Sequence, residues 1–168
     1  MMTWYAKSQT PLGEVLMLSD GTVLTGLYFF GQKHMPGIQA TWQNDPDLSI
    51  FITTAKQVSE YFNGTRKVFD IPYRFVVGTS FQQRVWHEIA KIEHGQRGCY
   101  SDLAKEVGSL RAVRAVGGAV GRNPLTLIVP CHRVFGVDGS LTGYAGGLER
   151  KKALALLEHQ KFATLKKV

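Results

Sequence analysis

The sequence has only two cysteines, Cys99 and Cys131, and none within residues 1–78. Two isolated cysteines are too few for a disulfide scaffold or for a zinc site built from several thiolates, so we expect no metal and no cofactor. No segment approaches the roughly 18 consecutive apolar residues of a membrane span. The first residues also lack the basic start and apolar stretch of a secretory signal. We therefore expect a cytoplasmic protein, nucleoid-associated if the source is bacterial, that has no membrane partner.

Net charge is absent from the first half of the chain. Residues 1–78 hold six Lys/Arg and six Asp/Glu, whereas residues 79–168 hold 14 and 7, so the second half carries the whole net charge of +7. With 44% hydrophobic residues, the composition is that of a globular protein. A basic half joined to a neutral one suits the binding of phosphate, nucleic acid or an acidic membrane surface. It equally suits a basic surface that only keeps the protein soluble.

The pattern of the first half predicts a small α/β domain over residues 1–78. Apolar runs at 12–18 and 23–30 flank an Asp-Gly turn and predict a β-hairpin. Apolar residues from Ile52 to Phe62 recur at helical spacing and predict a helix, and residues 68–72 predict a further strand. The second domain would then span residues 79–168.

The pattern of the second half predicts helices joined by short turns. A helix from Phe81 to Ile89 would begin behind Thr79 or Ser80 as its N-cap. Two further helices, over 102–107 and 110–120, would be capped by Ser101 and Ser109 and separated by Gly108. Helix, glycine turn and helix is the pattern of a helix-turn-helix, although many ordinary helical hairpins share it.

The second of these helices has two contrasting faces. Helical spacing places Val113, Val116 and Val120 on an apolar face, and Arg111, Arg114 and Gly118 on a basic one. Gly117 and Gly118 each cost about 1 kcal/mol relative to Ala inside a helix. Either tight helix packing or close approach of a large ligand would account for them.

The best candidate for chemistry is Cys131. The apolar, β-branched run 125–129 predicts a buried strand that ends at Pro130-Cys131-His132-Arg133. A lone cysteine is most often a small core residue, but neighbouring His and Arg favour the thiolate and so point to a nucleophile. A helix over 149–159 would place Glu158 where it could orient His132, unless Glu158 is a surface charge. The Gly-rich run 143–147 lacks the Gly-Lys-Ser/Thr ending of a phosphate loop.

Several of these segments together resemble the 6-O-alkylguanine-DNA alkyltransferases. The segments are Asn123-Pro124, Ile128-Val129-Pro130-Cys131-His132-Arg133-Val134, Gly143-Tyr144-Ala145-Gly146-Gly147-Leu148, Arg111 to Ala119, and Phe81-Gln82-Gln83-Arg84-Val85-Trp86. Weaker similarity reaches Thr10-Pro11-Leu12-Gly13 and Tyr61-Phe62-Asn63-Gly64. The resemblance implies a ribonuclease-H-like sheet domain followed by a helix-turn-helix, winged-helix-like domain.

The resemblance also implies a role for particular residues. Cys131 would take the alkyl group from guanine irreversibly, in a single turnover. His132 would draw the thiol proton through a water and be oriented by Glu158. Tyr100 would donate a proton or hydrogen bond to the leaving guanine, and Asn123 would fix the backbone before the active site.

The same resemblance implies how damaged DNA would be bound. Because a base inside a duplex cannot reach an interior cysteine, the nucleotide must be flipped out, and Arg114 would take its place in the stack. The residues implied to contact DNA are Arg114, Ala115, Arg111, Gly118 and Ser101. Those implied to line the base pocket are Val134, Tyr144, Ala145, Val120 and Pro130. The expected partner is duplex DNA containing alkylated guanine, bound by a monomer that can act cooperatively along DNA.

One segment departs from the family pattern. Before Tyr100 the family has Ile-Pro-aromatic-Gly, whereas this chain has Ile92-Glu93-His94-Gly95 followed by Gln96-Arg97-Gly98-Cys99. This difference bears on how Tyr100 is positioned and not on the nucleophile. We predict a single-turnover alkyl acceptor. The alternatives are an alkyltransferase-like sensor that binds alkylated DNA without chemistry, for which Cys131 would be unnecessary, and a cysteine hydrolase, which leaves the basic helix unexplained.

Overall fold

The computed structural model describes residues 1–159 and divides the chain into two compact units. The first comprises Met1–Val76 together with Pro124–Ile128, and the second comprises Val77–Asn123 and the chain from Val129 onward. Sequence analysis assigned all of 79–168 to one domain. The structure differs, because the short segment Pro124–Ile128 leaves the second unit and packs with the first.

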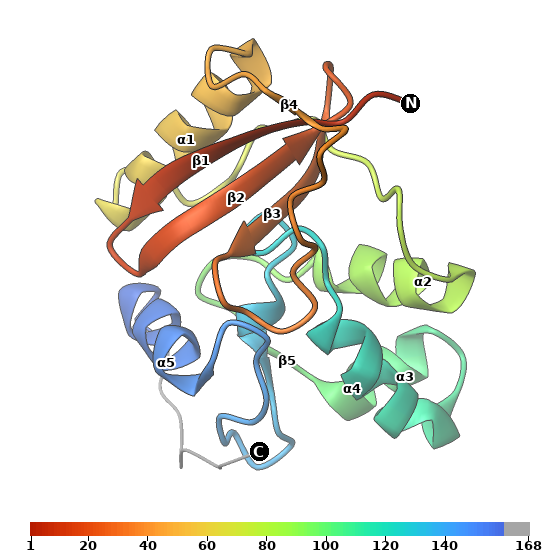
Figure 1. Cartoon of the computed structure of the whole chain (residues 1–168). Coiled ribbons are helices and arrows are strands. Elements are labelled where there is room, and N and C mark those ends of the chain that lie inside the picture. The colour runs from red at the N-terminus through yellow and green to blue at the C-terminus, as the bar shows by residue number, and fades with distance from the viewer. Residues whose placement is uncertain (160–168) are drawn as a thin grey trace. The chain divides into compact units, whose positions relative to one another are not determined.

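The first unit is built on a four-stranded sheet with the strand order β3-β2-β1-β4 (Figure 1). The strands are β1 (Trp4–Thr10), β2 (Gly13–Ser19), β3 (Leu24–Phe29) and β4 (Gln43–Asn44). β2 pairs with both β1 and β3 in the antiparallel sense, and β4 lies parallel to β1. The predicted hairpin is therefore confirmed as β2 and β3. The strand β1 was not predicted, because three consecutive apolar residues, Trp4 to Ala6, are followed only by the polar residues 7–10, so the sequence shows no alternation.

Two short segments from elsewhere in the chain cover the open edge of β3. Leu24 forms a bridge with Tyr73, and Leu27 forms one with Leu125. The amide of Leu27 donates to Pro124 O at 2.8 Å, and the amide of Thr126 donates to Leu27 O at 3.0 Å. Such cover satisfies backbone groups that an edge strand would otherwise leave unpaired. All six residues of β3 are buried.

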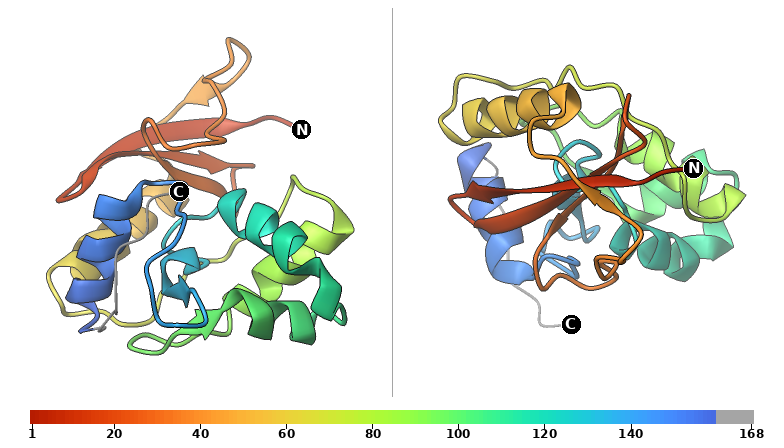
Figure 2. Two further views of the ribbon diagram at one scale, coloured as in Figure 1. Left: turned by 90° about the horizontal axis from the view of Figure 1, so that it is seen from below. Right: turned by 45° about the horizontal axis from the view of Figure 1, so that its top comes forward.

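Helix α1 (Ser49–Phe62) packs against the sheet of the first unit (Figure 2). Its buried residues recur at helical spacing, namely Ile50, Phe51, Thr54, Gln57, Val58 and Tyr61. The predicted helix is confirmed. The strand predicted at 68–72 is wrong, because only Tyr73 forms a bridge there and Asp70 bonds instead to the side chain of Gln57.

The second unit begins with helix α2 (Ser80–Ile89), which is held by a capping box. The hydroxyl of Thr79 accepts from the amide of Gln82 at 3.2 Å, and the Gln82 side chain accepts from the Thr79 amide at 3.0 Å. The indole of Trp86 donates to Ala119 O at 2.7 Å. Gly78 precedes the cap with a φ of +88°, and a Cβ there would collide with the Trp86 ring. Thr79 is therefore confirmed as the N-cap.

Helices α3 (Tyr100–Glu106) and α4 (Val113–Gly121) pack against each other and against α2 (Figures 1 and 2). Between them lie Gly108, with a φ of +83°, and a 3-10 turn η1 (Leu110–Ala112). The helix-turn-helix is confirmed, the predicted cap Ser101 is wrong, and Ser109 stands at the N-cap position of η1 without a side-chain capping bond. Ser101 lies inside α3, whose N-cap is Cys99.

The remaining elements of the second unit carry the residues around Cys131. They are β5 (Gly98–Cys99), the 3-10 turn η2 (Cys131–Arg133), β6 (Val134–Phe135) and α5 (Leu148–Leu157). β5 and β6 form a short parallel ladder, and α5 packs against η2. The strand predicted at 125–129 is wrong, since these residues form a turn in which Leu127 has a φ of +73°. No helix within residues 1–159 is both long and apolar enough to cross a membrane.

Candidate active site

Cys131 lies at the start of η2, and two hydrogen bonds to Val129 O hold the backbone there. Its amide donates to Val129 O at 2.8 Å, and the same oxygen accepts from Asn123 Nδ2 at 2.7 Å. Asn123 also forms a hydrogen bond with the Cys131 side chain. These bonds fit the role predicted for Asn123, which is to fix the backbone just before Cys131. The sequence predicted a strand directly before Cys131, whereas in the structure Cys131 follows a tight turn.

The Cys131 side chain is only 3% exposed. Burial raises the pKa of its thiol above the usual value, while the bond from Asn123 and the charge of Lys151 act in the opposite direction. In the resting protein Cys131 is therefore a thiol, and a base must remove its proton before it can act as a nucleophile.

His132, Arg133 and Glu158 form a buried polar cluster next to Cys131. His132 Nε2 lies 2.6 Å from Glu158 Oε2, and Arg133 Nε donates to Glu158 Oε1 at 2.8 Å. A second guanidinium nitrogen of Arg133 lies 3.3 Å from Oε2. The pairing of His132 with Glu158 that the sequence suggested is present, and Glu158 is a buried residue rather than a surface charge.

This cluster sets the protonation of His132. Burial lowers the pKa of the imidazole, so the ring is neutral near pH 7. A carboxylate can only accept, so Nε2 carries the proton and Nδ1 carries the lone pair. His132 is therefore poised to receive a proton at Nδ1 while Glu158 supports the charge that results.

The segment that departs from the family pattern is tied into this cluster. Ile92 O accepts from Arg133 Nη1 at 2.5 Å, and the amide of Gly95 lies 3.4 Å from Glu158 Oε1. The guanidinium carbon of Arg97 lies 4.8 Å from the centre of the Phe135 ring. The segment is therefore held in place although Glu93 stands where the family has proline. Its backbone supplies an acceptor to Arg133 and a donor to Glu158, the two members of the buried ion pair.

Tyr100 begins α3 and faces the loop that follows β6. Its hydroxyl donates to Gly143 O at 3.4 Å, and burial raises the pKa of the phenol. Tyr100 is thus protonated at neutral pH and can donate a hydrogen bond. In the same loop Gly146 lets the Tyr144 ring lie against the backbone, because a Cβ there would be 2.6 Å from Tyr144 Cε2.

The other residues predicted to line a base pocket differ in burial. Val120, Pro130 and Val134 are buried, whereas Tyr144 and Ala145 are half-buried in the loop that bears Gly143. Pro130 and Val134 flank η2 on either side. Their joint role as a pocket stays a prediction.

Lys151 is a site residue that the sequence analysis missed. Its side chain is fully buried, and its ammonium group donates to Thr142 O at 2.6 Å and lies 3.4 Å from Gly143 O. It also lies 5.4 Å from the centre of the Phe135 ring. The spacing in the sequence could have indicated its burial. Lys151, Leu154 and Glu158 recur at i, i+3 and i+7 and so lie on one face of α5.

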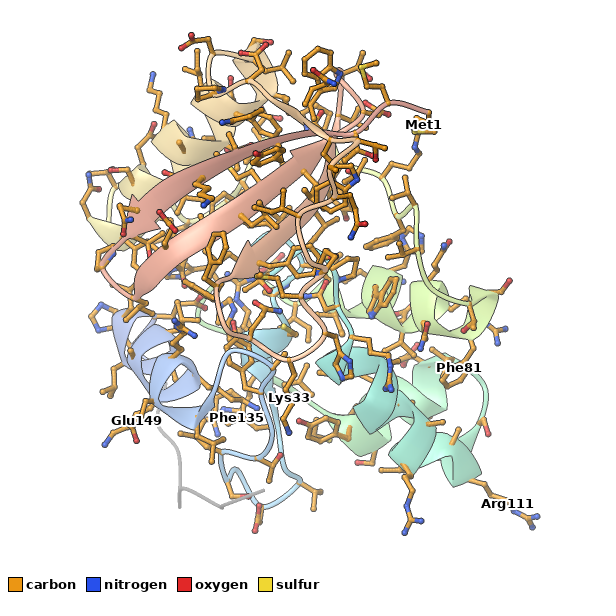
Figure 3. All side chains as sticks on the ribbon, in the orientation of Figure 1. Met1, Lys33, Phe81, Arg111, Phe135 and Glu149 are labelled. Atoms are coloured by element: carbon orange, nitrogen blue, oxygen red, sulfur yellow. The ribbon has the colours of Figure 1, made fainter. Side chains whose placement is uncertain are left out.

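The η1–α4 surface, residues 110–121, contrasts with the buried cluster. Arg111, Arg114 and Ala115 are exposed, and neither arginine forms an ion pair with any residue in the described range. Figure 3 shows the Arg111 side chain extending away from the ribbon. Spacing placed Val113 on the apolar face with Val116 and Val120, but Val113 is 40% exposed, so its expected burial with them is wrong. It begins α4, where the helix has turned its first residues outward.

Gly117 and Gly118 of α4 are not explained by packing within the described chain. A Cβ at Gly117 would meet nothing within 4 Å beyond its own helix, and one at Gly118 would meet only the Arg122 side chain, at 3.6 Å. Of the two explanations left open by the sequence, close approach of an outside ligand is the one that fits. Ser101, also predicted to contact DNA, is half-buried, and its hydroxyl lies 3.1 Å from Cys99 Sγ.

The described residues offer no group of three or more His, Cys, Asp or Glu side chains placed to hold a metal ion. The chemistry available in the second unit is that of a buried thiol, a neutral imidazole and a carboxylate. The same unit carries a helix-turn-helix with two exposed arginines, Arg111 and Arg114, that form no ion pair within residues 1–159. These features define a class of protein that binds DNA and acts through a nucleophilic cysteine.

Comparison with known proteins identifies the family within this class. Residues 80–160 match the family model described as 6-O-methylguanine DNA methyltransferase, DNA binding domain. Residues 3–75 match the ribonuclease-like domain of the same family. The chain therefore belongs to the 6-O-methylguanine DNA methyltransferase family, as the resemblance in its sequence indicated.

Relatives and solved structures agree with this assignment. The chain is 40% identical over 156 residues to a methylated-DNA–protein-cysteine methyltransferase of Haemophilus influenzae, covering 92% of this chain and 86% of that one. It is 41% identical over 157 residues to the protein of that name from Mycobacterium tuberculosis, covering 94% and 93%. The crystal structure of Mycobacterium tuberculosis OGT in complex with DNA is similar with a TM-score of 0.85 at 40% identity, over 92% of each chain.

Proposed function

We propose that this protein repairs duplex DNA by transferring the alkyl group of a 6-O-alkylguanine onto Cys131, once per protein molecule. The observation that carries the proposal is the buried thiol of Cys131 beside a His132–Glu158 pair at 2.6 Å. Methylated-DNA–protein-cysteine methyltransferases at about 40% identity along nearly the whole chain support it.

The transfer is a displacement at the alkyl carbon. His132 accepts the thiol proton of Cys131 at Nδ1, through a water, and the sulfur then forms a bond to the alkyl carbon as the bond from that carbon to guanine O6 breaks. The electron pair of the broken bond stays with guanine, and the Tyr100 hydroxyl donates a proton or hydrogen bond to the ring. The product thioether has no route back to a thiol, so the protein is consumed.

The approach of the base requires DNA to be distorted. The η1–α4 surface would lie against the duplex, with Gly117 and Gly118 allowing close approach and Arg114 filling the space left by the flipped nucleotide. Arg111, Ala115 and Ser101 would contact the DNA around that point. We propose that a monomer binds and that neighbouring monomers can bind cooperatively.

The intact mass of the protein after incubation with duplex DNA containing 6-O-methylguanine tests the proposal. We expect one added methyl group per molecule, mapped by peptide analysis to Cys131, and no addition to Cys131→Ser. Cys99→Ser is the matched control, because it removes the other thiol and should still accept one group. Methyl found on Cys99, or methanol released in repeated turnovers, would contradict single transfer to Cys131.

A further inference from the structure

The loop that faces Tyr100 contains a buried hydroxyl group, that of Thr142. Thr142 precedes Gly143, whose carbonyl oxygen accepts from the Tyr100 hydroxyl at 3.4 Å. The carbonyl oxygen of Thr142 itself accepts from Lys151 Nζ at 2.6 Å, so the backbone of the residue is held. Its hydroxyl oxygen is buried, yet it has no partner with full hydrogen-bond geometry within residues 1–159. Burying such a group without a partner is unfavourable, so the hydroxyl calls for an explanation.

The side chain that the Thr142 hydroxyl approaches is Tyr100. Burial raises the pKa of the Tyr100 phenol, and the contact with the Thr142 hydroxyl acts in the opposite direction. A neighbour has this effect on a phenol when it donates a hydrogen bond to the ionised oxygen. In the resting protein, where the Tyr100 hydroxyl is directed to Gly143 O, the contact falls short of a full hydrogen bond.

Packing alone does not account for a threonine at this position. Valine has nearly the same shape and would bury no polar group. A hydroxyl is more useful than a methyl group only where an acceptor needs it, and hydrogen bonds to an ionised acceptor are about twice as strong as those between neutral groups. Tyr100 O gains negative charge in the transfer step, as its proton moves toward the leaving guanine.

We propose that Thr142 is a positioning residue of the transfer reaction, whose hydroxyl donates a hydrogen bond to Tyr100 O while Tyr100 donates to the leaving guanine. The inference rests on the proposed function. As the bond from the alkyl carbon to guanine O6 breaks, guanine keeps that electron pair and draws the Tyr100 proton. The electron pair of the phenolic O–H bond stays on Tyr100 O.

Thr142 neither gains nor loses a proton in this step. Its hydroxyl supports the negative charge on Tyr100 O and so makes Tyr100 a better donor, because hydrogen bonds in a chain strengthen one another. Catalytic hydrogen bonds are often long or poorly aligned before the substrate binds and tighten in the complex. The resting geometry of Thr142 fits that behaviour.

A double-mutant cycle tests the proposal, with the rate of transfer from free 6-O-benzylguanine base onto Cys131 as the readout, so that DNA binding plays no part. Thr142→Val removes the hydroxyl and keeps the shape, and Tyr100→Phe removes the oxygen that would accept from it. We expect Thr142→Val to react about three- to tenfold more slowly than the wild type, as the loss of one hydrogen bond typically gives. In the Tyr100→Phe protein, adding Thr142→Val should cause no further loss.

Two further variants distinguish the hydroxyl from the packing of the loop. Thr142→Ser keeps the hydroxyl and should react within about twofold of the wild type, since its one missing methyl group takes no part in the hydrogen bond. Ser140→Ala is the matched control, because it removes another buried hydroxyl of the same loop, one that bonds to Asp138 at 2.6 Å. It should match the wild type in rate.

The outcomes separate this role from a structural one and from the proposed function. A Thr142→Val rate equal to that of the wild type, an equal loss in the Tyr100→Phe protein, or a Thr142→Ser rate as low as that of Thr142→Val would overturn the proposal. If Thr142→Val fails to fold, Thr142→Ala replaces it and is compared with Thr142→Ser, from which it differs only in the hydroxyl. A wild type that transfers no alkyl group to Cys131 would instead overturn the proposed function.

Discussion

The second unit holds two groups of charged side chains, one around Cys131 and one on the η1–α4 surface, and they differ in burial and in pairing. Around Cys131, the cations Arg133 and Lys151 and the anion Glu158 are buried, and each has a hydrogen-bond partner within 2.8 Å. On the η1–α4 surface, Arg111 and Arg114 are exposed and lack ion-pair partners within the described range. The buried region is complete by itself, whereas the surface is arranged for contacts that another molecule must supply.

The difference separates two kinds of contribution to function. Changes in the buried region should alter stability and reactivity together, because charge and packing are coupled there. Changes on the surface should alter reaction with duplex DNA and leave both stability and reaction with a free base unaffected. Each of the following predictions tests one side of this division.

The largest expected effect comes from Glu158→Gln. The substitution leaves the buried guanidinium of Arg133 without a counter-charge and should lower the free energy of unfolding by about 3–5 kcal/mol. It should also slow alkyl transfer, because His132 loses the carboxylate that supports its positive form. Urea denaturation followed by fluorescence measures the first effect. Glu149→Gln, an exposed change on the same helix, is the control, and equal stabilities for the two variants would contradict the buried cluster.

A smaller loss of stability should follow the reaction itself. An S-alkyl group on Cys131 adds volume to a side chain that is 3% exposed, and overpacking a core typically costs about 1–3 kcal/mol. The alkylated protein should therefore melt at a lower temperature than the same protein incubated with unmodified DNA. A calorimetric scan after complete reaction gives the comparison. An unchanged or higher melting temperature would mean that the site has room for the product.

On the surface, Arg114→Ala should act only where there is a base stack to open. Unstacking a base costs a few kcal/mol, so losing a side chain that offsets part of it should slow transfer from duplex DNA about tenfold or more at saturating DNA. Transfer from free 6-O-benzylguanine should stay the same. Arg111→Ala is the matched surface control and should weaken binding without changing the saturated rate. If Arg114→Ala slows both substrates equally, the division between surface and interior fails.

The smallest expected effect concerns the helix starts. Thr79→Ala removes an observed capping bond and should cost about 1 kcal/mol of unfolding free energy. Ser109→Ala removes no such bond at the start of η1 and should change stability by less than about 0.5 kcal/mol. Chemical denaturation of the two variants in parallel tests the contrast. A larger loss for Ser109→Ala would show that its hydroxyl caps the turn after all.

The features that depend on local pattern could be predicted from the amino-acid sequence. The hairpin of β2 and β3, the helices α1 and α2 with the Thr79 cap, and the helix-turn-helix around Gly108 all follow from spacing and turn chemistry that neighbouring residues decide. The nucleophile was predictable for a similar reason. Cys131, His132 and Arg133 are consecutive, so their chemistry could be read without knowing the fold.

Features that depend on residues far apart in the chain could not be predicted and became visible in the folded structure. The run 125–129 has strand composition, yet it forms a turn because β3 takes its backbone bonds at Pro124 and Thr126. The ion pair of Arg133 with Glu158 and the burial of Lys151 arise where α5 packs against η2 and the 142–143 loop. Burial and charge compensation are set by long-range packing, so composition and periodicity could place a cysteine at the centre of the site but could not supply the charges that surround it.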